Sequence, residues 1–192
     1  MKDVIDLVDL AQTLPQLIID MKYATADNLT GHPIYAEALC LLHPDAARGL
    51  ARSVAVAEQS GYRLQLYDAY RPHAAQIHLW DACPDPRFVA SLAVGSHHSR
   101  GVAVDVTLLD EQGKTLDMGT GFDEMNEKSY AWCAALPVAV QRNRLQLYAV
   151  MAAGGFVGIE TEWWHFELPD ADRYPLLPDR FGCTLPHCRT AV

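Results

Sequence analysis

Three segments of the chain repeat apolar residues with the spacing of a helix. The first follows His43-Pro44-Asp45, has its proline in the first turn and ends at Gly61; its apolar stripe consists of Leu50, Val54 and Ala57. The second begins at Pro72 and runs towards Trp80. The third covers 138–153 and ends at Gly154-Gly155. These three ranges are the predicted helices.

Two segments alternate apolar and polar positions, as strands do. Residues 63–68 alternate and are followed by Ala69-Tyr70-Arg71-Pro72, so we expect Arg71 at the end of a strand. Residues 102–109 place valines and Leu108 on one face and Asp105 on the other, which predicts that the first face joins the core. Helices and strands alternate irregularly, which predicts an α+β fold: a single domain over 1–192 with a central, largely antiparallel sheet flanked by helices.

Two further segments lack such patterns. Residues 110–129 are rich in Gly, Asp, Thr and Met, which predicts a long functional loop. The tail after Leu168 is rich in Pro and Asp, and we expect it to cover part of the surface.

Charge and cysteine content narrow the classes of function. Fifteen Lys and Arg against 24 Asp and Glu give a net charge of -9, which argues against binding to nucleic acid or to anionic membranes. The N-terminal segment lacks a basic region followed by an unbroken apolar one, so it does not read as a signal peptide. Five scattered cysteines do not form a disulfide framework and indicate a reducing compartment. We therefore expect a cytoplasmic protein with a small substrate; its oligomeric state, homo-oligomer included, stays open.

The first segment with candidate chemistry is 96–105. His98 and Asp105 lie seven positions apart, and Gly101 between them allows a sharp turn before the strand that carries Asp105. A single His-Asp pair is a weak signal, because most such pairs are surface or capping residues. The neighbouring His97 is a rival ligand, and spacing alone does not separate it from His98.

The second segment with candidate chemistry is Glu162-Trp163-Trp164-His165. Its Glu and His are three positions apart, which brings them together on a turn but sends them to opposite faces of a flat strand. We therefore expect a turn or kink here. Taken alone, the segment would be an aromatic core stretch with a buried histidine. With the first segment, it completes what a zinc amide hydrolase needs: three ligands, an open position and a carboxylate base.

Both segments resemble signatures of the zinc D-Ala-D-Ala peptidases, Ser-x-His-x-x-Gly-x-Ala-x-Asp and Glu-x-x-His. The chain is similar to the narrower, VanX-like group of D-alanyl-D-alanine dipeptidases, and the similarity covers most of its length. It includes the segments 20–28, 68–72 and 118–123. Within the last of these, Gly121 stands where we would expect a bulkier residue.

The resemblance implies one zinc ion per chain, held by His98, Asp105 and His165. It implies Glu162 as the general base and Arg71 as the cation that stabilises the oxyanion. The metal site would then lie at the sheet. From the residue alone, Arg71 would instead be a structural arginine that bridges a strand end to a carboxylate.

For substrate binding, the resemblance implies Asp123 at the ammonium of a small dipeptide, with Tyr23 and Ser96 near the substrate termini. The implied reaction is hydrolysis of D-Ala-D-Ala, either to recycle a cell-wall dipeptide or to confer vancomycin resistance. Alternatives are a related carboxypeptidase or endopeptidase on longer peptidoglycan peptides, and a non-catalytic zinc-binding domain. We expect only structural roles for Cys183 and Cys188. We expect surface positions for the remaining histidines, which are His32, His43, His73, His78 and His187.

Overall fold

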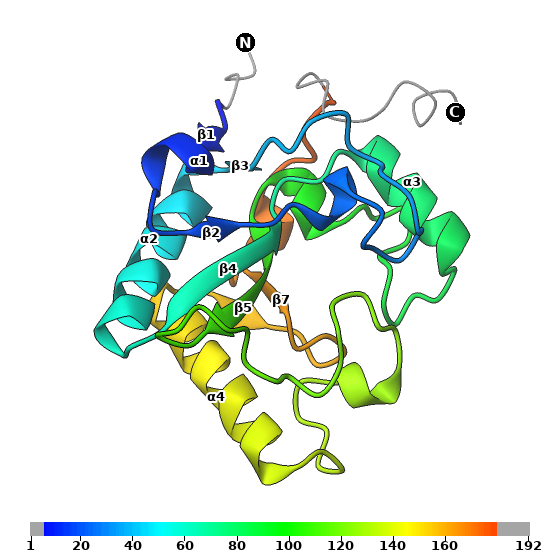
Figure 1. The fold of residues 1–192 in the computed structure, drawn as a ribbon. Helices are drawn as coiled ribbons and strands as arrows, with labels where there is room; N and C mark the ends of the chain where they lie inside the picture. Colours follow the sequence, from blue (N-terminus) through cyan, green and yellow to red (C-terminus); the bar gives the residue numbers. More distant parts are fainter. Residues whose placement is uncertain (1–5, 180–192) are drawn as a thin grey trace.

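The main sheet is the central element of the computed structural model, which describes residues 6–179. Within that range it has five strands, in the order β2-β4-β5-β7-β6 (Figure 1). Their bounds are β2 Ile18–Ile19, β4 Arg63–Asp68, β5 Ala103–Leu109, β6 Val157–Gly158 and β7 His165–Glu167. β2 is parallel to β4, and the other neighbouring pairs are antiparallel. The predicted α+β fold with a largely antiparallel sheet is confirmed.

A small second sheet and several helices surround the main sheet. The small sheet pairs β1 (Val8–Asp9) with β3 (Leu41–Leu42). The α-helices are α1 Leu10–Thr13, α2 Pro44–Gln59, α3 His73–Ala82 and α4 Val138–Ala153. Short 3-10 turns are η1 Lys22–Ala24, η2 His97–Arg100, η3 Glu127–Ser129 and η4 Ala171–Arg173. Figure 1 shows α2 and α4 together on one side of the sheet and α3 on the other side of the molecule.

The predicted helices match the observed ones closely. In α2 the predicted stripe of Leu50, Val54 and Ala57 is buried. One prediction was wrong: His43 is not a surface residue but is 9% exposed, and its Nδ1 accepts a hydrogen bond from the backbone N–H of Asp45. A side-chain acceptor at this position satisfies one of the free N–H groups of the first turn, so His43 serves as the helix cap.

β5 forms the centre of the core. Every residue from Ala103 to Leu109 is buried, so both faces of this strand are covered. The face of Val104, Val106 and Leu108 joins the main hydrophobic core, as predicted. The opposite face, which carries Asp105, is covered by the polar residues described below rather than by solvent.

The loop and tail take the places that the sequence predicted. Residues 110–129 form a long connection that contains only the turn η3, apart from a bridge between Leu109 and Thr115. The described part of the tail packs on η2, where the Leu177 backbone N–H donates to the Ser99 carbonyl. Cys183, His187 and Cys188 lie outside the described residues, whereas Cys40, Cys83 and Cys133 are free thiols.

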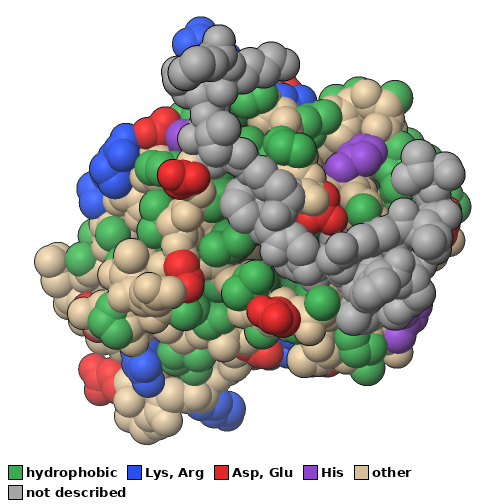
Figure 2. Space-filling view, turned by 90° about the horizontal axis from the view of Figure 1, so that it is seen from above, with side chains coloured by type: hydrophobic (Ala, Val, Ile, Leu, Met, Phe, Trp, Pro, Cys, Tyr) green, Lys and Arg blue, Asp and Glu red, His purple; other side chains and the backbone are tan. Residues whose placement is uncertain are grey.

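On the face shown in Figure 2, Lys and Arg side chains of the described residues are interspersed with Asp and Glu. None of the helices between residues 6 and 179 has the length and apolar character needed to cross a membrane.

Gly101 connects η2 to β5 in a left-handed conformation, with φ of 70°. A Cβ at this position would lie 3.3 Å from the His43 backbone nitrogen and 3.2 Å from Leu7 Cδ2. We expect Gly101→Ala to lower the free energy of unfolding by about 1–2 kcal/mol from backbone strain, plus a cost for that crowding. Gly113→Ala is the matched control, because Gly113 has φ of 78° but nothing within 4 Å of its Cβ position. Urea unfolding of both variants should show the larger loss for Gly101; equal losses would contradict the crowding.

Candidate active site

One row of paired residues crosses three strands of the sheet. Asp105 on β5 lies opposite Asp68 on β4 and opposite His165 on β7. The register shifts between Leu66 and Asp68, whereas an unbroken ladder would place Tyr67 opposite Asp105. This irregularity therefore brings Asp68 into the row, and such bulges commonly redirect side chains beside active sites.

His98 reaches the same place from the turn η2. Its position is fixed at both ends of the turn: the Ser96 hydroxyl accepts from the His98 backbone N–H at 3.2 Å, and Gly101 ends the turn. The His98 ring Nδ1 lies 2.7 Å from the Ala69 carbonyl oxygen. Since a carbonyl can only accept, Nδ1 carries the proton and Nε2 presents its lone pair.

Three buried ligand atoms converge at the sheet. His98 Nε2 lies 3.1 Å from His165 Nδ1, and each of these nitrogens lies 3.3 Å from Asp105 Oδ1. The His165 Nε2 proton is donated to Glu167 Oε2 at 2.9 Å, which leaves Nδ1 with a free lone pair. Asp105 Oδ1 is buried without a hydrogen-bond partner. Three acceptors that face one another in this way suit a cation, and the three residues form a possible metal site.

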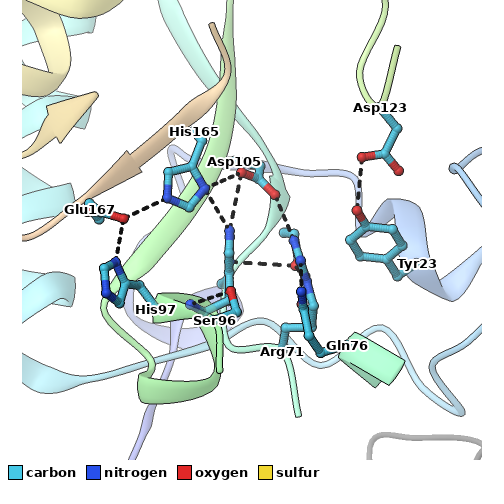
Figure 3. Close-up of polar contacts among 12 residues, drawn as sticks. Tyr23, Arg71, Gln76, Ser96, His97, Asp105, Asp123, His165 and Glu167 are labelled. Atoms are coloured by element: carbon cyan, nitrogen blue, oxygen red, sulfur yellow. Dashed lines mark hydrogen bonds and ion pairs between the residues drawn. The ribbon is translucent and has the colours of Figure 1, made fainter. Parts of the chain in front are cut away.

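Arg71 follows the end of β4, as predicted, and is 7% exposed. Its guanidinium donates to three side chains: Nε to Asp68 at 2.8 Å, Nη1 to Gln76 at 3.0 Å and Nη2 to Asp105 Oδ2 at 3.2 Å. The Tyr23 ring lies against it, with 4.9 Å from Arg71 Cζ to the ring centroid. Figure 3 shows this guanidinium beside the ligand cluster. The cation is therefore rigidly held next to Asp105.

Glu162 directly precedes the turn of Trp163 and Trp164 that leads into β7, so the predicted turn between Glu162 and His165 is confirmed. The residue is 7% exposed, and burial raises the pKa of its carboxyl to about 8. It lines a cavity of about 260 Å³ together with Arg71, Ser96, His98 and His165. The two candidate histidine ligands, the base and the cation thus share one cavity, and Asp105 lies behind them in the ligand cluster.

Asp123 and Tyr23 form a separate pair on the far side of Arg71 (Figure 3). The Tyr23 hydroxyl donates to Asp123 Oδ1 at 3.0 Å, and the Leu29 backbone N–H donates to Oδ2 at 2.9 Å. Burial raises the pKa of Asp123 to about 7. Its φ of 63° is in the left-handed region, a conformation that non-glycine residues adopt mainly where the surroundings impose it. The structure does not place this pair among the residues that line the cavity, unlike Ser96.

Comparison with known proteins agrees with this geometry. The family model for D-ala-D-ala dipeptidase, peptidase M15, matches residues 3–185. The chain belongs to the D-Ala-D-Ala dipeptidase family. It is 59% identical to the D-alanyl-D-alanine dipeptidase of Escherichia coli K12 over 183 residues, 95% of each chain. It is 33% identical to the enzyme of that name from Enterococcus faecium, over 81% of this chain and 87% of the relative. The corresponding enzyme from Streptomyces coelicolor is 35% identical over 81% and 89%.

Membership of the dipeptidase family makes the protein a metallopeptidase, and the predicted resemblance is confirmed. The structure also separates the two neighbouring histidines. His98 joins the ligand cluster, whereas the two ring nitrogens of His97 contact Glu167 and Asp172.

Sequence reasoning missed three polar residues around the site of this dipeptidase: Asp68, Gln76 and Glu167. Asp68 accepts from both Arg71 and the Tyr35 hydroxyl, and Gln76 accepts from Arg71. Asp68 could have been found from its place at the end of a strand, three residues before Arg71. Glu167 could have been found because residues two apart on a strand share a face, which places it beside His165.

Proposed function

We propose that the protein is a single-domain, zinc-dependent dipeptidase that hydrolyses D-Ala-D-Ala to two molecules of D-Ala in the cytoplasm. The observation that carries the proposal is the ligand cluster of His98, Asp105 and His165, whose two histidines line one cavity with Glu162 and Arg71. The D-alanyl-D-alanine dipeptidase relatives, which align over most of the chain, support the choice of substrate.

The ligand cluster fits one zinc ion. Tetrahedral zinc, with bonds of about 2.0–2.2 Å to nitrogen and carboxylate oxygen, holds neighbouring ligand atoms roughly 3.3–3.6 Å apart. The ligand atoms of His98, Asp105 and His165 lie 3.1–3.3 Å from one another, close to the distances expected around zinc. When bound, the ion polarises the scissile carbonyl and makes water easier to deprotonate.

Glu162 acts as the proton carrier in this proposal. Its carboxylate accepts a proton from the attacking water and returns it to the amine that leaves. A carboxyl with a pKa of about 8 is suited to both transfers near neutral pH, because it binds and releases a proton there.

Arg71 stabilises the negative charge that develops on the carbonyl oxygen. Its three hydrogen bonds hold the guanidinium before substrate binds, so no reorganisation is needed during the reaction. We expect Arg71→Ala to lower kcat by about 10²–10³-fold while zinc content stays near one ion per chain. Arg63→Ala, on the exposed first residue of β4, is the control and should behave as wild type. A change in KM alone would contradict the role in the transition state.

As the family resemblance implies, we place Asp123 at the substrate ammonium, with Tyr23 and Ser96 near the substrate termini; of these three residues only Ser96 lines the cavity. The buried Asp123 has a pKa of about 7, so its carboxyl is neutral at lower pH and attracts a cation only at higher pH. We therefore expect KM for the dipeptide to rise as the pH falls below about 7. An aspartate with its ordinary pKa would stay ionised down to about pH 4, and KM would then rise only below that pH. In Asp123→Asn, KM should be high and should lose this dependence. An Asn variant with wild-type KM values would remove Asp123 from the substrate site.

The function as a whole is tested by amino-acid release from three substrates: D-Ala-D-Ala, L-Ala-L-Ala and a pentapeptide that ends in D-Ala-D-Ala. Each assay is run with purified, zinc-loaded protein, with and without chelator. Chelator-sensitive cleavage of the D,D-dipeptide alone supports the proposal. Cleavage of the pentapeptide would instead indicate a carboxypeptidase, and zinc binding without any cleavage would indicate a non-catalytic domain.

A further inference from the structure

Glu167 lies between two imidazoles. Its Oε2 accepts from His165 Nε2 at 2.9 Å and lies 2.7 Å from His97 Nδ1. The other nitrogen of His97, Nε2, lies 3.0 Å from Asp172 Oδ1. Figure 3 shows the first part of this chain of contacts, from His97 through Glu167 to His165 and on to Asp105. One carboxylate oxygen therefore joins a candidate metal ligand to a histidine outside the ligand cluster.

The fold fixes both partners of Glu167. His165 and Glu167 lie two residues apart on β7 and so face the same side, and β7 is held in register on β5 by the pairs Asp105–His165 and Ala103–Glu167. His97 comes from η2, the same turn that supplies His98. The turn sends the two adjacent rings to different places: His98 into the ligand cluster and His97 to the outer side of Glu167.

We infer that Glu167 is a positioning residue of the metal site, held in place by His97. The inference rests on the proposed zinc site. By accepting the Nε2 proton, Glu167 fixes the tautomer of His165 and the rotation of its ring, so that the Nδ1 lone pair faces His98 and Asp105. Without this acceptor the ring can rotate, and the proton can move to Nδ1, where it blocks metal binding.

The two histidine ligands differ in the charge of their acceptors. His98 donates to a neutral carbonyl, that of Ala69, whereas His165 donates to a carboxylate. A charged acceptor makes the stronger hydrogen bond and the more basic imidazole. The strength with which His165 binds a metal therefore depends on a side chain that a mutation can remove. The acceptor of His98 is a backbone carbonyl, which a mutation of Ala69 leaves in place.

The test compares zinc affinity in metal-free protein by competition with a chromophoric chelator, and the absorption spectrum after loading with Co²⁺. Glu167→Ala should weaken zinc binding by about 10- to 100-fold and change the Co²⁺ spectrum. Glu167→Gln keeps an acceptor oxygen without its charge and should recover part of the affinity. His97→Ala should weaken binding by less than Glu167→Ala. The control is Asp170→Ala, which removes an exposed carboxylate of the same segment and should match wild type.

Thermal unfolding of each metal-free variant checks that the fold is kept. If Glu167→Ala raises KM while zinc affinity and the Co²⁺ spectrum stay as in wild type, Glu167 contacts substrate and the positioning role is overturned. Unchanged affinity in every Glu167 variant overturns it as well. Failure of the underlying zinc site is distinguishable, because wild-type protein would then bind no zinc, or His165→Ala would bind it as tightly as wild type does.

Discussion

Replacing Glu162 with glutamine should lower kcat for D-Ala-D-Ala by about 10²–10⁴-fold, the usual contribution of a positioned acid–base group. Glutamine has nearly the same shape but cannot accept the proton of the attacking water. Glu162 is not one of the three clustered ligands, so zinc content should stay near one ion per chain. The measurement is steady-state release of D-Ala, together with metal analysis of the same preparation.

The matched control for this variant is Glu160→Gln. Glu160 is two residues away and exposed, so its loss changes the charge of the segment without touching the cavity that Glu162 lines. Its kcat should equal that of wild type. Wild-type turnover in Glu162→Gln would remove Glu162 as the base, and a loss of zinc would make it a ligand instead.

His165→Ala should abolish both zinc binding and turnover. The substitution removes one of three ligand atoms and leaves the Glu167 carboxylate without one of its two imidazole partners. Metal analysis after dialysis against limiting zinc measures the first effect. Zinc at 100 times its Kd should raise the free energy of unfolding of the wild type by about 2.7 kcal/mol, and it should add far less to the variant.

His32→Ala is the control for this second prediction. His32 is exposed, and its ring makes a hydrogen bond with the backbone carbonyl of Thr30, away from the ligand cluster. It should retain one zinc ion and full activity. A fully metallated and active His165→Ala would show that the ligand set is wrong, and attention would then turn to His97.

Elements with a long, regular pattern could be predicted from the sequence. The helix over 138–153 and the strand over 63–68 both have the observed bounds, and Arg71 lies three residues beyond the end of that strand. The six residues of the implied catalytic centre and pocket rim also come together: Arg71, Ser96, His98, Asp105, Glu162 and His165. Local periodicity was sufficient for the elements, while the grouping of the site residues came from the family resemblance.

The rest depended on contacts between distant segments. β6 and β7 have only two and three residues, too few to show a period. The register shift beside Tyr67 is a property of the pairing with β5 and leaves no mark in β4 itself. The contacts of Gln76 with Arg71 and of Glu167 with His97 also arise only when distant segments are packed together. Such long-range pairing is decided by the fold as a whole.

The row of Asp68, Asp105 and His165 across β4, β5 and β7 also bears on how the protein assembles. If one of these strands slipped by one residue against its neighbour, all of its side chains would turn to the opposite face of the sheet. The ligand set is thus complete only when these strands pair in the native register. An ion bound there would stabilise only the native register, so mispaired chains should remain metal-free. Removing the ion with a chelator should speed amide hydrogen exchange along β5 and β7 before it affects α2.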